Sequence, residues 1–384
     1  MNNVISISNL PFFWRIKKHV QDKVPEIPER FLFEFSIIPE IQLIIEKRNH
    51  DLDRHLSDVY KLDANIGFLQ DGHALADSYG TEFVSFIDES LEVNNVSLKL
   101  ATEIGCGGGD VLQKLLNKGI KVKGIDPSPL AARQGEKLGF PVLKEFYPTP
   151  KLHEKSDLIF HYDVLEHVSD PMNFLAHNFE DLNVNGILAF GLPDCTESIE
   201  HGDISMAMHE HMNYFDDNSL RLALTRAGFQ EITIKKSNHG GLLFACARKT
   251  SEIKAAYTDN TSISKLHSFE EKFNRYALKM KRFIDDMNSR NKDAVLGFYV
   301  PLRAFPYISY FKLKHDFRLF DDSASLYQGF YDGIDIPIEN FEDLVKSPPT
   351  HVIIMTFRFA DVIERKIRNK LGDKIMVASL RSFV

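Results

Sequence analysis

The feature that most constrains this fold is a glycine-rich turn between an apolar run and a helix-forming segment. The run 98–104 contains Glu103, and glycines stand at positions 105, 107, 108 and 109, directly before Asp110. Glycine adopts left-handed φ and lets a ligand approach the backbone closely. A second apolar run ends in Asp126, about 20 positions after Gly105, the spacing at which an acid reaches a ribose hydroxyl. These positions predict a site for a ribose-bearing cofactor at the carboxyl ends of parallel strands.

The acidic side chains at this turn discriminate between cofactors. A dinucleotide site needs a third glycine where this chain has Asp110, because the helix N-terminus must face a pyrophosphate. A carboxylate at that position repels phosphate, and Glu103 adds a second negative charge. Carboxylates are good partners for the ammonium group of an amino acid. The pocket therefore suits a nucleoside that carries an amino acid and no phosphate, and S-adenosylmethionine (SAM) fits.

Three motifs in the chain resemble, in the expected order, those of class I SAM-dependent methyltransferases. They are Glu103-Ile-Gly-Cys-Gly-Gly-Gly109, Gly124-Ile-Asp-Pro-Ser128 and the segment 157–171, and the resemblance covers about residues 95–250. It implies SAM as cofactor, S-adenosylhomocysteine as product, and Asp126 on the ribose hydroxyls. The cofactor-binding residues that we infer are Glu103, Gly105, Cys106, Gly107, Gly109, Asp126, Pro127, Ser128, His161, Tyr162 and Tyr79. Cys106 is expected to fill space rather than to act as a nucleophile. The alternative is an α/β domain with tight turns and no ligand.

The order of elements predicts an α/β chain. Strands and helices alternate from 98 to 250, which is typical of a Rossmann-like sheet, here of seven strands with an antiparallel last hairpin at 229–247. Asp110 and Asp217 are predicted to cap helices. The expected domains are a mainly helical N-terminal region 1–94, the methyltransferase domain 95–250, a linker and long helix 251–290, and a second small α/β Rossmann-like domain 291–384.

Two N-terminal segments have open interpretations. Residues 10–24 mix Phe12, Phe13 and Trp14 with basic residues, which suits a membrane-surface helix or an arm docked on the body or on a second subunit. Residues 67–80 could form a lid over SAM.

The charge and cysteine content exclude some classes of function. A net charge of −8 argues against a surface for nucleic acid or an anionic membrane. No apolar run approaches the roughly 20 residues that span a bilayer. The three scattered cysteines form neither a disulfide framework nor a metal-binding knuckle. We expect a cytoplasmic enzyme for a small-molecule substrate, with no nucleic acid or membrane partner; a monomer and a homodimer both remain open.

A cluster of proton-transferring residues lies between the fifth strand and the next helix. Residues 206–215 contain His209, Glu210, His211 and Tyr214, and such loops face the cofactor. Histidine is the usual general base near neutral pH, and a carboxylate can orient it. Consecutive residues converge poorly on one ion and no cysteine is near, so no metal site is predicted. His167, after the fourth strand, is either a helix-capping residue or a substrate contact.

A longer resemblance covers residues 95–384. The methyltransferase core is followed by the His-Glu-His motif at 209–211, by His239-Gly-Gly241, and by a second α/β domain with Phe320-Asp-Asp322 and Gln328-Gly329. This order is similar to the three-domain C-methyltransferases of nucleotide-linked deoxysugars, whose last domain helps to hold the nucleotide-sugar between itself and the core. The resemblance implies that His211, assisted by Glu210, removes a proton next to the keto group of the sugar. His239, Gly240 and Arg303 are inferred substrate contacts, although 239–241 could equally be a simple turn.

The chain also departs from that family. The family begins with a cysteine-rich zinc module, whereas residues 1–90 contain no cysteine. Met208 stands where members often have a tyrosine, and Val300 and Pro301, with Arg303 nearby, replace a Gly-rich turn and a lysine. Carbon methylation, oxygen methylation and binding without turnover therefore stay open at this point.

Overall fold

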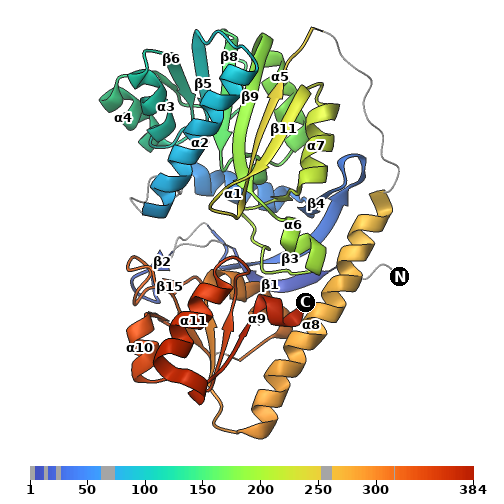
Figure 1. Cartoon of the computed structure of the whole chain (residues 1–384), viewed down its shortest axis with the longest axis vertical. Helices are drawn as coiled ribbons and strands as arrows, with labels where there is room; N and C mark the ends of the chain where they lie inside the picture. Colours follow the sequence, from blue (N-terminus) through green and yellow to red (C-terminus); the bar gives the residue numbers. More distant parts are fainter. Residues whose placement is uncertain (1–4, 13–15, 23–26, 62–73, 252–261, 315) are drawn as a thin grey trace. The chain divides into compact units, whose positions relative to one another are not determined.

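The chain divides into two compact units in a computed structural model (Figure 1). The large-sheet unit comprises Ile37–Cys195 and His211–Ser262, and the small-sheet unit comprises Met1–Ser36, Thr196–Glu210 and Ile263–Val384. The structure describes all residues other than 1–4, 13–15, 23–26, 62–73, 252–261 and 315. The N-terminal region expected at 1–94 is shared between the two units.

The large-sheet unit is built on a seven-stranded sheet. Its strands are β5 (Leu100–Ile104), β6 (Lys121–Ile125), β7 (Val142–Leu143), β8 (Ser156–Tyr162), β9 (Leu182–Pro193), β11 (Gln230–Lys236) and β12 (Leu242–Arg248). They lie in the order β11-β12-β9-β8-β5-β6-β7. Four neighbouring pairs are parallel: β9 with β8, β8 with β5, β5 with β6, and β6 with β7. β12 is antiparallel to both of its neighbours, β9 and β11. The predicted α/β sheet with its antiparallel last hairpin is confirmed.

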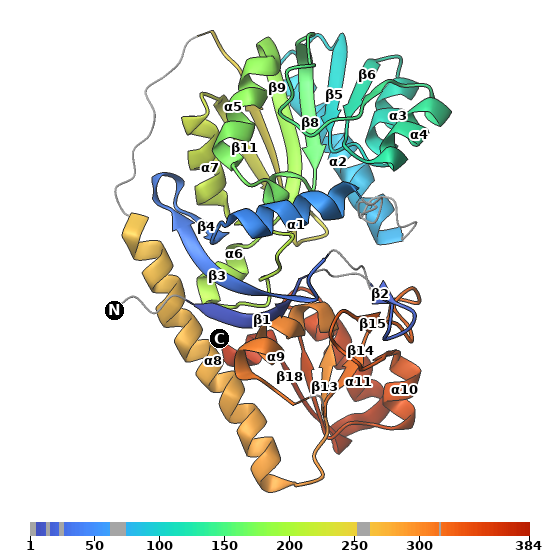
Figure 2. The same ribbon diagram turned by 180° about the vertical axis from the view of Figure 1, so that it is seen from behind.

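Helices cover both faces of this sheet (Figure 1, Figure 2). They are α2 (Ala74–Val93), α3 (Asp110–Asn117), α4 (Pro129–Leu138), α5 (Pro171–Asp181) and α7 (Asp217–Arg226). Successive side chains of β8 point to opposite faces, as the period of a strand requires. Leu158 and Phe160 pack with apolar residues of α2, α3 and α4, while Ile159 packs with those of α5 and α7. A run that is apolar on both faces therefore becomes a central strand.

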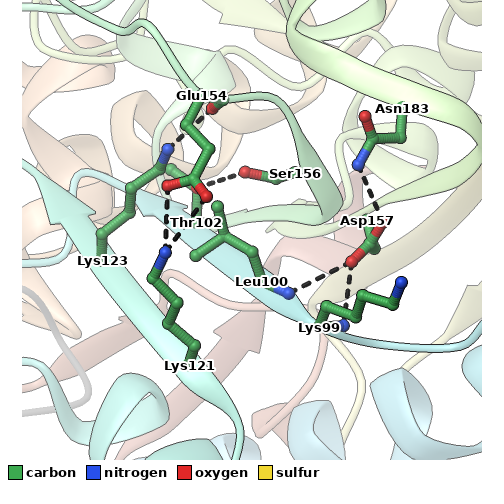
Figure 3. A network of polar contacts seen from close by, with 9 residues as sticks. All are labelled: Lys99, Leu100, Thr102, Lys121, Lys123, Glu154, Ser156, Asp157 and Asn183. Carbon is green, nitrogen blue, oxygen red and sulfur yellow. Dashed lines mark hydrogen bonds and ion pairs between the residues drawn. The ribbon is translucent and has the colours of Figure 1, made fainter.

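A polar network joins the amino ends of the central strands (Figure 3). The Asp157 carboxylate accepts hydrogen bonds from the backbone N–H groups of Lys99 and Leu100, at 2.8 and 3.1 Å, and from Asn183 Nδ2 at 2.8 Å. In the same network the hydroxyls of Thr102 and Ser156 lie 2.5 Å apart. These bonds fix β5, β8 and β9 at the edge opposite the glycine-rich turn, which follows the carboxyl end of β5.

The small-sheet unit contains a parallel five-stranded sheet. Its strands are β13 (Leu296–Tyr299), β14 (Arg318–Phe320), β16 (Ile338–Glu339), β17 (His351–Ile354) and β18 (Met376–Ser379), in the order β16-β14-β13-β17-β18. Its helices are α6 (Thr196–His201), α8 (Ser262–Arg290), α9 (Phe305–Phe311), α10 (Phe341–Lys346) and α11 (Ala360–Leu371). β2 (Ile16–Lys17) pairs with β15 (Phe330–Tyr331). The second parallel α/β domain predicted near the C-terminus is confirmed.

The prediction of a mainly helical N-terminal region was wrong for its first half. β1 (Ser6–Pro11) pairs antiparallel with β3 (Arg30–Ile38), and β4 (Leu43–Glu46) pairs with β10 (Asn213–Tyr214). The physical reason is a period of two: Phe31, Phe33 and Phe35 alternate with other residues, and Phe33 and Phe35 are buried.

Helices begin only at α1 (His50–Lys61) and α2. Of the segment 10–24, for which a surface helix was one interpretation, residues 10–11 and 16–17 lie in strands and Trp14 lies outside the described residues. Of the suggested lid at 67–80, residues 67–73 lie outside the described residues and residues 74–80 form the start of α2. Among the described helices, none has both the length and the apolar character needed to cross a bilayer.

Both predicted helix caps shift by one residue. The N-cap of α3 is Gly109, in left-handed conformation, and Asp110 is instead the first helical residue, with its carboxylate 2.6 Å from Lys114 Nζ. The N-cap of α7 is Asp216 rather than Asp217: its carboxylate accepts a hydrogen bond from the Ser219 N–H at 2.9 Å. In each case the aspartate predicted as the cap lies in the first turn, where a negative charge favours the helix dipole.

Candidate functional site

The glycine turn adopts a backbone that other residues rarely take. Gly105, Gly107 and Gly109 have φ values of 68°, 45° and 74°. The Gly105 N–H donates a hydrogen bond to Ile125 O at 2.7 Å, which joins the turn to the end of β6. An added Cβ at Gly105 would lie only 2.6 Å from Val164 Cγ2. The glycines are thus required by φ and by packing, and the turn lies directly against the segment that follows β8.

Asp126 connects the glycine turn to the end of β6. Its Oδ2 accepts the Gly107 N–H at 2.9 Å, and its Oδ1 accepts the Ser128 N–H at 2.8 Å across Pro127. Each carboxylate oxygen has two lone pairs, so Asp126 can accept further hydrogen bonds while it holds the loop. This position and chemistry fit the ribose hydroxyls of the inferred cofactor.

Glu103 gives the pocket an uncompensated acidic group. Its side chain is buried and its Oε2 has no hydrogen-bond partner. Burial, with Asp110 and Asp126 nearby, raises the pKa of Glu103 well above its usual value, although a hydrogen bond from the Leu112 backbone opposes this. A buried carboxyl among other acids would be stabilised by a cation. The amino-acid moiety of SAM carries an ammonium and a sulfonium, so the residues present fit this cofactor.

The Cys106 thiol lies in the same turn but is not a nucleophile. Burial, followed by the charges of Glu103 and Asp126, raises the pKa of Cys106 well above its usual value. The thiolate is the reactive form of cysteine, so the protonated thiol is inert. A Cβ added at Gly124 would lie 2.5 Å from Cys106 Sγ, which shows how closely the sulfur fills the space between the two strand ends.

The two residues at the end of β8 point to opposite faces of the sheet. The His161 ring stacks on Phe190 with centroids 4.6 Å apart and contacts the edge of Phe174. Burial lowers the pKa of His161 to about 3, so the ring is neutral and belongs to the core. Tyr162 lies on the other face beside Phe83, and its buried hydroxyl has no hydrogen-bond partner. Both ring nitrogens of His161 are likewise buried without a hydrogen-bond partner, so neither side chain of this pair has its polar atoms satisfied.

Directly after β8, two ionisable side chains, Glu166 and His167, come close to His211. The Glu166 side chain is only 1% exposed, and neither carboxylate oxygen has a hydrogen-bond partner. His167 Nε2 lies 3.8 Å from Glu166 Oε1, and the rings of His167 and His211 meet edge to face with centroids 4.8 Å apart. Asp163 adds a buried Oδ1 without a hydrogen-bond partner. Burial raises the pKa of Asp163 to about 7.

Backbone and amide hydrogen bonds hold the His211 segment against this turn. The Met212 N–H donates to Glu166 O at 2.7 Å. The buried Asn213 side chain donates from Nδ2 to the carbonyls of Leu165 and Val168, both at 2.8 Å. Arg48 Nη2 in turn donates to Asn213 Oδ1 at 2.8 Å. These bonds hold the backbone on both sides of His167 and on the side of His211 that leads to Met212 and Asn213.

The other residues predicted around His211 lie in different surroundings. The His209 ring is fully buried in the small-sheet unit among Phe12, Phe31 and Phe33, with centroids 5.3, 5.7 and 5.6 Å away. Glu210 is the last residue of that unit's middle segment, and Tyr214 is a buried residue of β10. Of the predicted catalytic residues, the structure brings together His211 and His167.

Tyr79, which was predicted to bind the cofactor, and the predicted substrate contacts lie on other elements. Tyr79 Oη donates to Gly240 O at 2.6 Å, so this tyrosine anchors the turn before β12. His239 Nε2 lies 3.9 Å from Glu82 Oε2, at a depression lined by Asp77, Ser78, Thr81, Glu82, Asn238 and His239. Arg303 lies in a short 3₁₀ turn, Pro301–Ala304, in the small-sheet unit; it follows Val300, whose φ is 64°.

Sequence reasoning missed Glu166, Asp163, Asn213 and Arg48 as residues of the site. The signal for the first two was present, because Asp-Val-Leu-Glu-His follows an apolar strand at the edge where ligands bind. No local pattern marks Asn213 or Arg48, since their role depends on a turn far away in the sequence.

Two family models match most of the region that carries these residues. A model described as a methyltransferase domain matches residues 99–234, and a model described as a C-methyltransferase C-terminal domain matches residues 239–378.

Individual curated proteins are similar to a smaller part of the chain. The ubiquinone biosynthesis O-methyltransferase of Pseudomonas fluorescens is 30% identical over 115 residues, which are 28% of this chain and 48% of that protein. The mitochondrial one of Schizosaccharomyces pombe is 28% identical over 177 residues, 43% of this chain and 64% of that protein. The chain thus spans about half the length of the first of these relatives.

Solved structures similar to this chain include the magnesium protoporphyrin IX methyltransferase of Synechocystis with bound SAM. It is 15% identical, with a TM-score of 0.36, over 52% of this chain and 90% of that one. The N-methyltransferase NodS of Bradyrhizobium japonicum is 19% identical, with a TM-score of 0.36, over 46% of this chain and 98% of that one. With its glycine turn, Asp126 and seven-stranded sheet, and with both family models in sequence, this chain belongs to the class I SAM-dependent methyltransferases and carries a C-methyltransferase C-terminal domain.

Proposed function

We propose that the protein methylates a carbon atom of a nucleotide-linked keto-sugar, with SAM as the methyl donor and S-adenosylhomocysteine as a product. The observation that carries the proposal is the position of His211, hydrogen-bonded through its neighbours to a turn that itself packs on Gly105. A candidate base and the glycine turn thus belong to one hydrogen-bonded and packed assembly. The match of residues 239–378 to a C-methyltransferase C-terminal domain supports carbon as the acceptor.

For methyl transfer to a carbon next to a ketone, the main chemical group that the protein must supply is a base. A carbon next to a ketone becomes nucleophilic only after it loses a proton, and an imidazole near neutral pH is suited to remove it. SAM supplies an activated methyl group on a sulfonium that leaves as a neutral thioether. The remaining task of the chain is positioning, which brings the attacking carbon close to the methyl group and in line with it.

His167 supports this role for His211. Its ring meets the His211 ring edge to face, and its Nε2 faces the buried Glu166 carboxylate at 3.8 Å. Burial, and then the charge of Asp163, raises the pKa of Glu166 well above its usual value, so we assign this carboxyl group to orienting the His167 ring beside His211. We therefore give Glu166 the supporting part that the sequence analysis gave to Glu210.

A second candidate is methyl transfer to a hydroxyl oxygen. The names of the curated relatives, ubiquinone biosynthesis O-methyltransferases, favour it, and His211 could equally take a proton from a hydroxyl. Both reactions use the same cofactor and the same base. They differ in the atom that carries the new methyl group.

One experiment separates the two candidates. The protein is incubated with methyl-labelled SAM and a panel of nucleotide-linked keto-sugars, and the product methyl group is identified by NMR. We expect a methyl on carbon and, without SAM, loss of deuterium from the position next to the ketone. A methyl on oxygen contradicts carbon transfer, and no SAM consumption with any acceptor contradicts the proposal as a whole.

Two variants assign the roles of the residues. His211→Ala should lower kcat by roughly 10²- to 10⁴-fold, the usual contribution of a general base, with SAM affinity nearly unchanged. Asp126→Ala should weaken SAM binding first, because it removes the acceptor for the Gly107 and Ser128 N–H groups. His153→Ala is the matched control, since His153 is exposed and precedes the amino end of β8. Normal turnover in His211→Ala would remove His211 as the base.

A further inference from the structure

We propose that Glu166, His167 and His211 form a binding site for one divalent transition-metal ion. One possible ligand atom from each residue lies within 4.8 Å of the other two. Glu166 Oε1 and His167 Nε2 are 3.8 Å apart. Two donors on a tetrahedral zinc ion lie about 3.4 Å apart when each bond is about 2.1 Å, so small side-chain rotations complete the geometry.

The burial of Glu166 is the independent observation that points to a ligand. The side chain is 1% exposed, yet neither oxygen accepts a hydrogen bond, and Asp163 Oδ1 nearby is likewise buried without a hydrogen-bond partner. Buried charged groups are normally paired or bound to a metal. One Glu166 carboxylate oxygen lies within 4.8 Å of a ring nitrogen of each of two imidazoles, those of His167 and His211. A cation between them would supply the charge that these oxygens lack.

The loops that carry the three residues are already joined. The Met212 N–H bonds to Glu166 O, and Asn213 bonds to the carbonyls of Leu165 and Val168. The ligands therefore come from two distant segments that the backbone holds together without an ion. The prediction from the sequence considered only the consecutive residues 209–211, which do not converge; the site instead combines His211 with the turn after β8.

The donor set indicates which ions bind. Two imidazole nitrogens and one carboxylate suit Zn²⁺, Co²⁺, Mn²⁺ or Fe²⁺, whereas Mg²⁺ prefers oxygen ligands and bound water. Three protein ligands leave at least one position open. A ligating His211 nitrogen cannot take a proton. Ion binding and proton removal at His211 would therefore exclude each other, so a bound ion would block the proton transfer, a consequence that rests on the proposed function.

The test measures binding without SAM or substrate, so its result does not depend on methyl transfer. The full chain is stripped with a chelator and titrated with Co²⁺, whose visible absorption reports nitrogen and oxygen ligands and coordination number, and with Zn²⁺ by calorimetry. We expect one equivalent of each to bind, with micromolar or tighter affinity, and no comparable binding of Mg²⁺. No binding at millimolar Co²⁺ or Zn²⁺ would overturn the proposal.

Variants show whether these residues hold the ion. His167→Ala, His211→Ala and the isosteric Glu166→Gln should each weaken Co²⁺ binding at least tenfold and change its visible spectrum. His239→Ala and His267→Ala are matched controls, because each removes a histidine that lies next to glutamate elsewhere on the chain. Circular dichroism verifies the fold, and His167→Ala, at a partly exposed side chain, remains informative if Glu166→Gln does not fold. One equivalent that persists in all three variants would place the ion elsewhere.

Discussion

The packing of the glycine turn makes a quantitative prediction for Gly105→Ala. Gly105 has a φ of 68°, and the added Cβ would lie 2.6 Å from Val164 Cγ2. Left-handed backbone costs a residue with a Cβ about 1–2 kcal/mol, and overpacking costs a further ~1–3 kcal/mol. We expect the free energy of unfolding to fall by about 2–5 kcal/mol, and SAM affinity to fall because the displaced turn carries Gly107.

Gly119→Ala is the matched control for the backbone contribution. Gly119 has a φ of 79°, but no atom lies within 4 Å of the Cβ that alanine would add. It should therefore lose only the backbone part, about 1–2 kcal/mol, and retain normal SAM affinity. The difference between the two variants measures the contact with Val164.

A double-mutant cycle identifies the partner directly. Val164→Ala removes Cγ2, so Gly105→Ala introduced into that background should recover roughly 1–3 kcal/mol relative to its effect in the wild type. Urea unfolding followed by circular dichroism gives the stabilities, and calorimetry gives the SAM affinities. Equal losses in Gly105→Ala and Gly119→Ala, together with no coupling to Val164, would refute the reasoning.

Three further variants or treatments test other parts of the site. Asn213→Ala leaves two carbonyls and Arg48 without their amide partner, so we expect a loss of ~2–5 kcal/mol in urea unfolding and a larger fall in kcat than in SAM affinity. Asn183→Ala, at the opposite sheet edge, should lower stability alone. Because the folded pKa of Asp163 is raised from 3.8 to about 7, the unfolded chain ionises first as pH rises, and stability falls across that window. Asp163→Asn should remove this fall in stability. Measured in the presence of a chelator, the free energy of unfolding of Asp163→Asn minus that of the wild type should therefore increase from about pH 4 to about pH 8. A difference that stays constant over this pH range would contradict the raised pKa of Asp163. Finally, the three cysteines are buried, so a disulfide reagent should titrate them only after denaturation, and rapid native reaction at Cys106 would contradict its raised pKa.

The cofactor turn could be predicted from the sequence because its determinants are local. A strand, a turn with positive φ and a helix follow each other directly, and Asp126 reaches the turn from the next parallel strand. The N-terminal strands were missed because the alternation of Phe31, Phe33 and Phe35 is short, and because its partner β1 ends at Pro11, well before β3 begins at Arg30. Pairing between strands so separated in the sequence depends on tertiary contacts that no local propensity contains.

The proton-transfer residues were predicted less completely for a different reason. His209 and His211 are separated by one residue, yet the chain passes from one compact unit to the other between Glu210 and His211. The composition of the His-Glu-His motif suggests one cluster, but the backbone assigns His209 to an aromatic core and His211 to the turn after β8. Residues that are close in the sequence therefore separate here, whereas the segment after the strand end at 162 and the motif at 209–211 each contain one of the two histidines that the structure brings together.

The short turn that contains Val164 connects the glycine turn to the segment that contains His211. Val164 packs on Gly105, its neighbour Asp163 directly follows β8, and Glu166 and His167 follow within three residues. The Glu166 carbonyl also holds the backbone next to His211. Displacement of this turn must therefore alter the glycine turn and the two imidazoles together. Because Gly105 has no side chain, Val164 can pack against it, and this contact positions the turn that holds the proposed base. The packing favours glycine at position 105 even if Gly105 itself makes no contact with SAM.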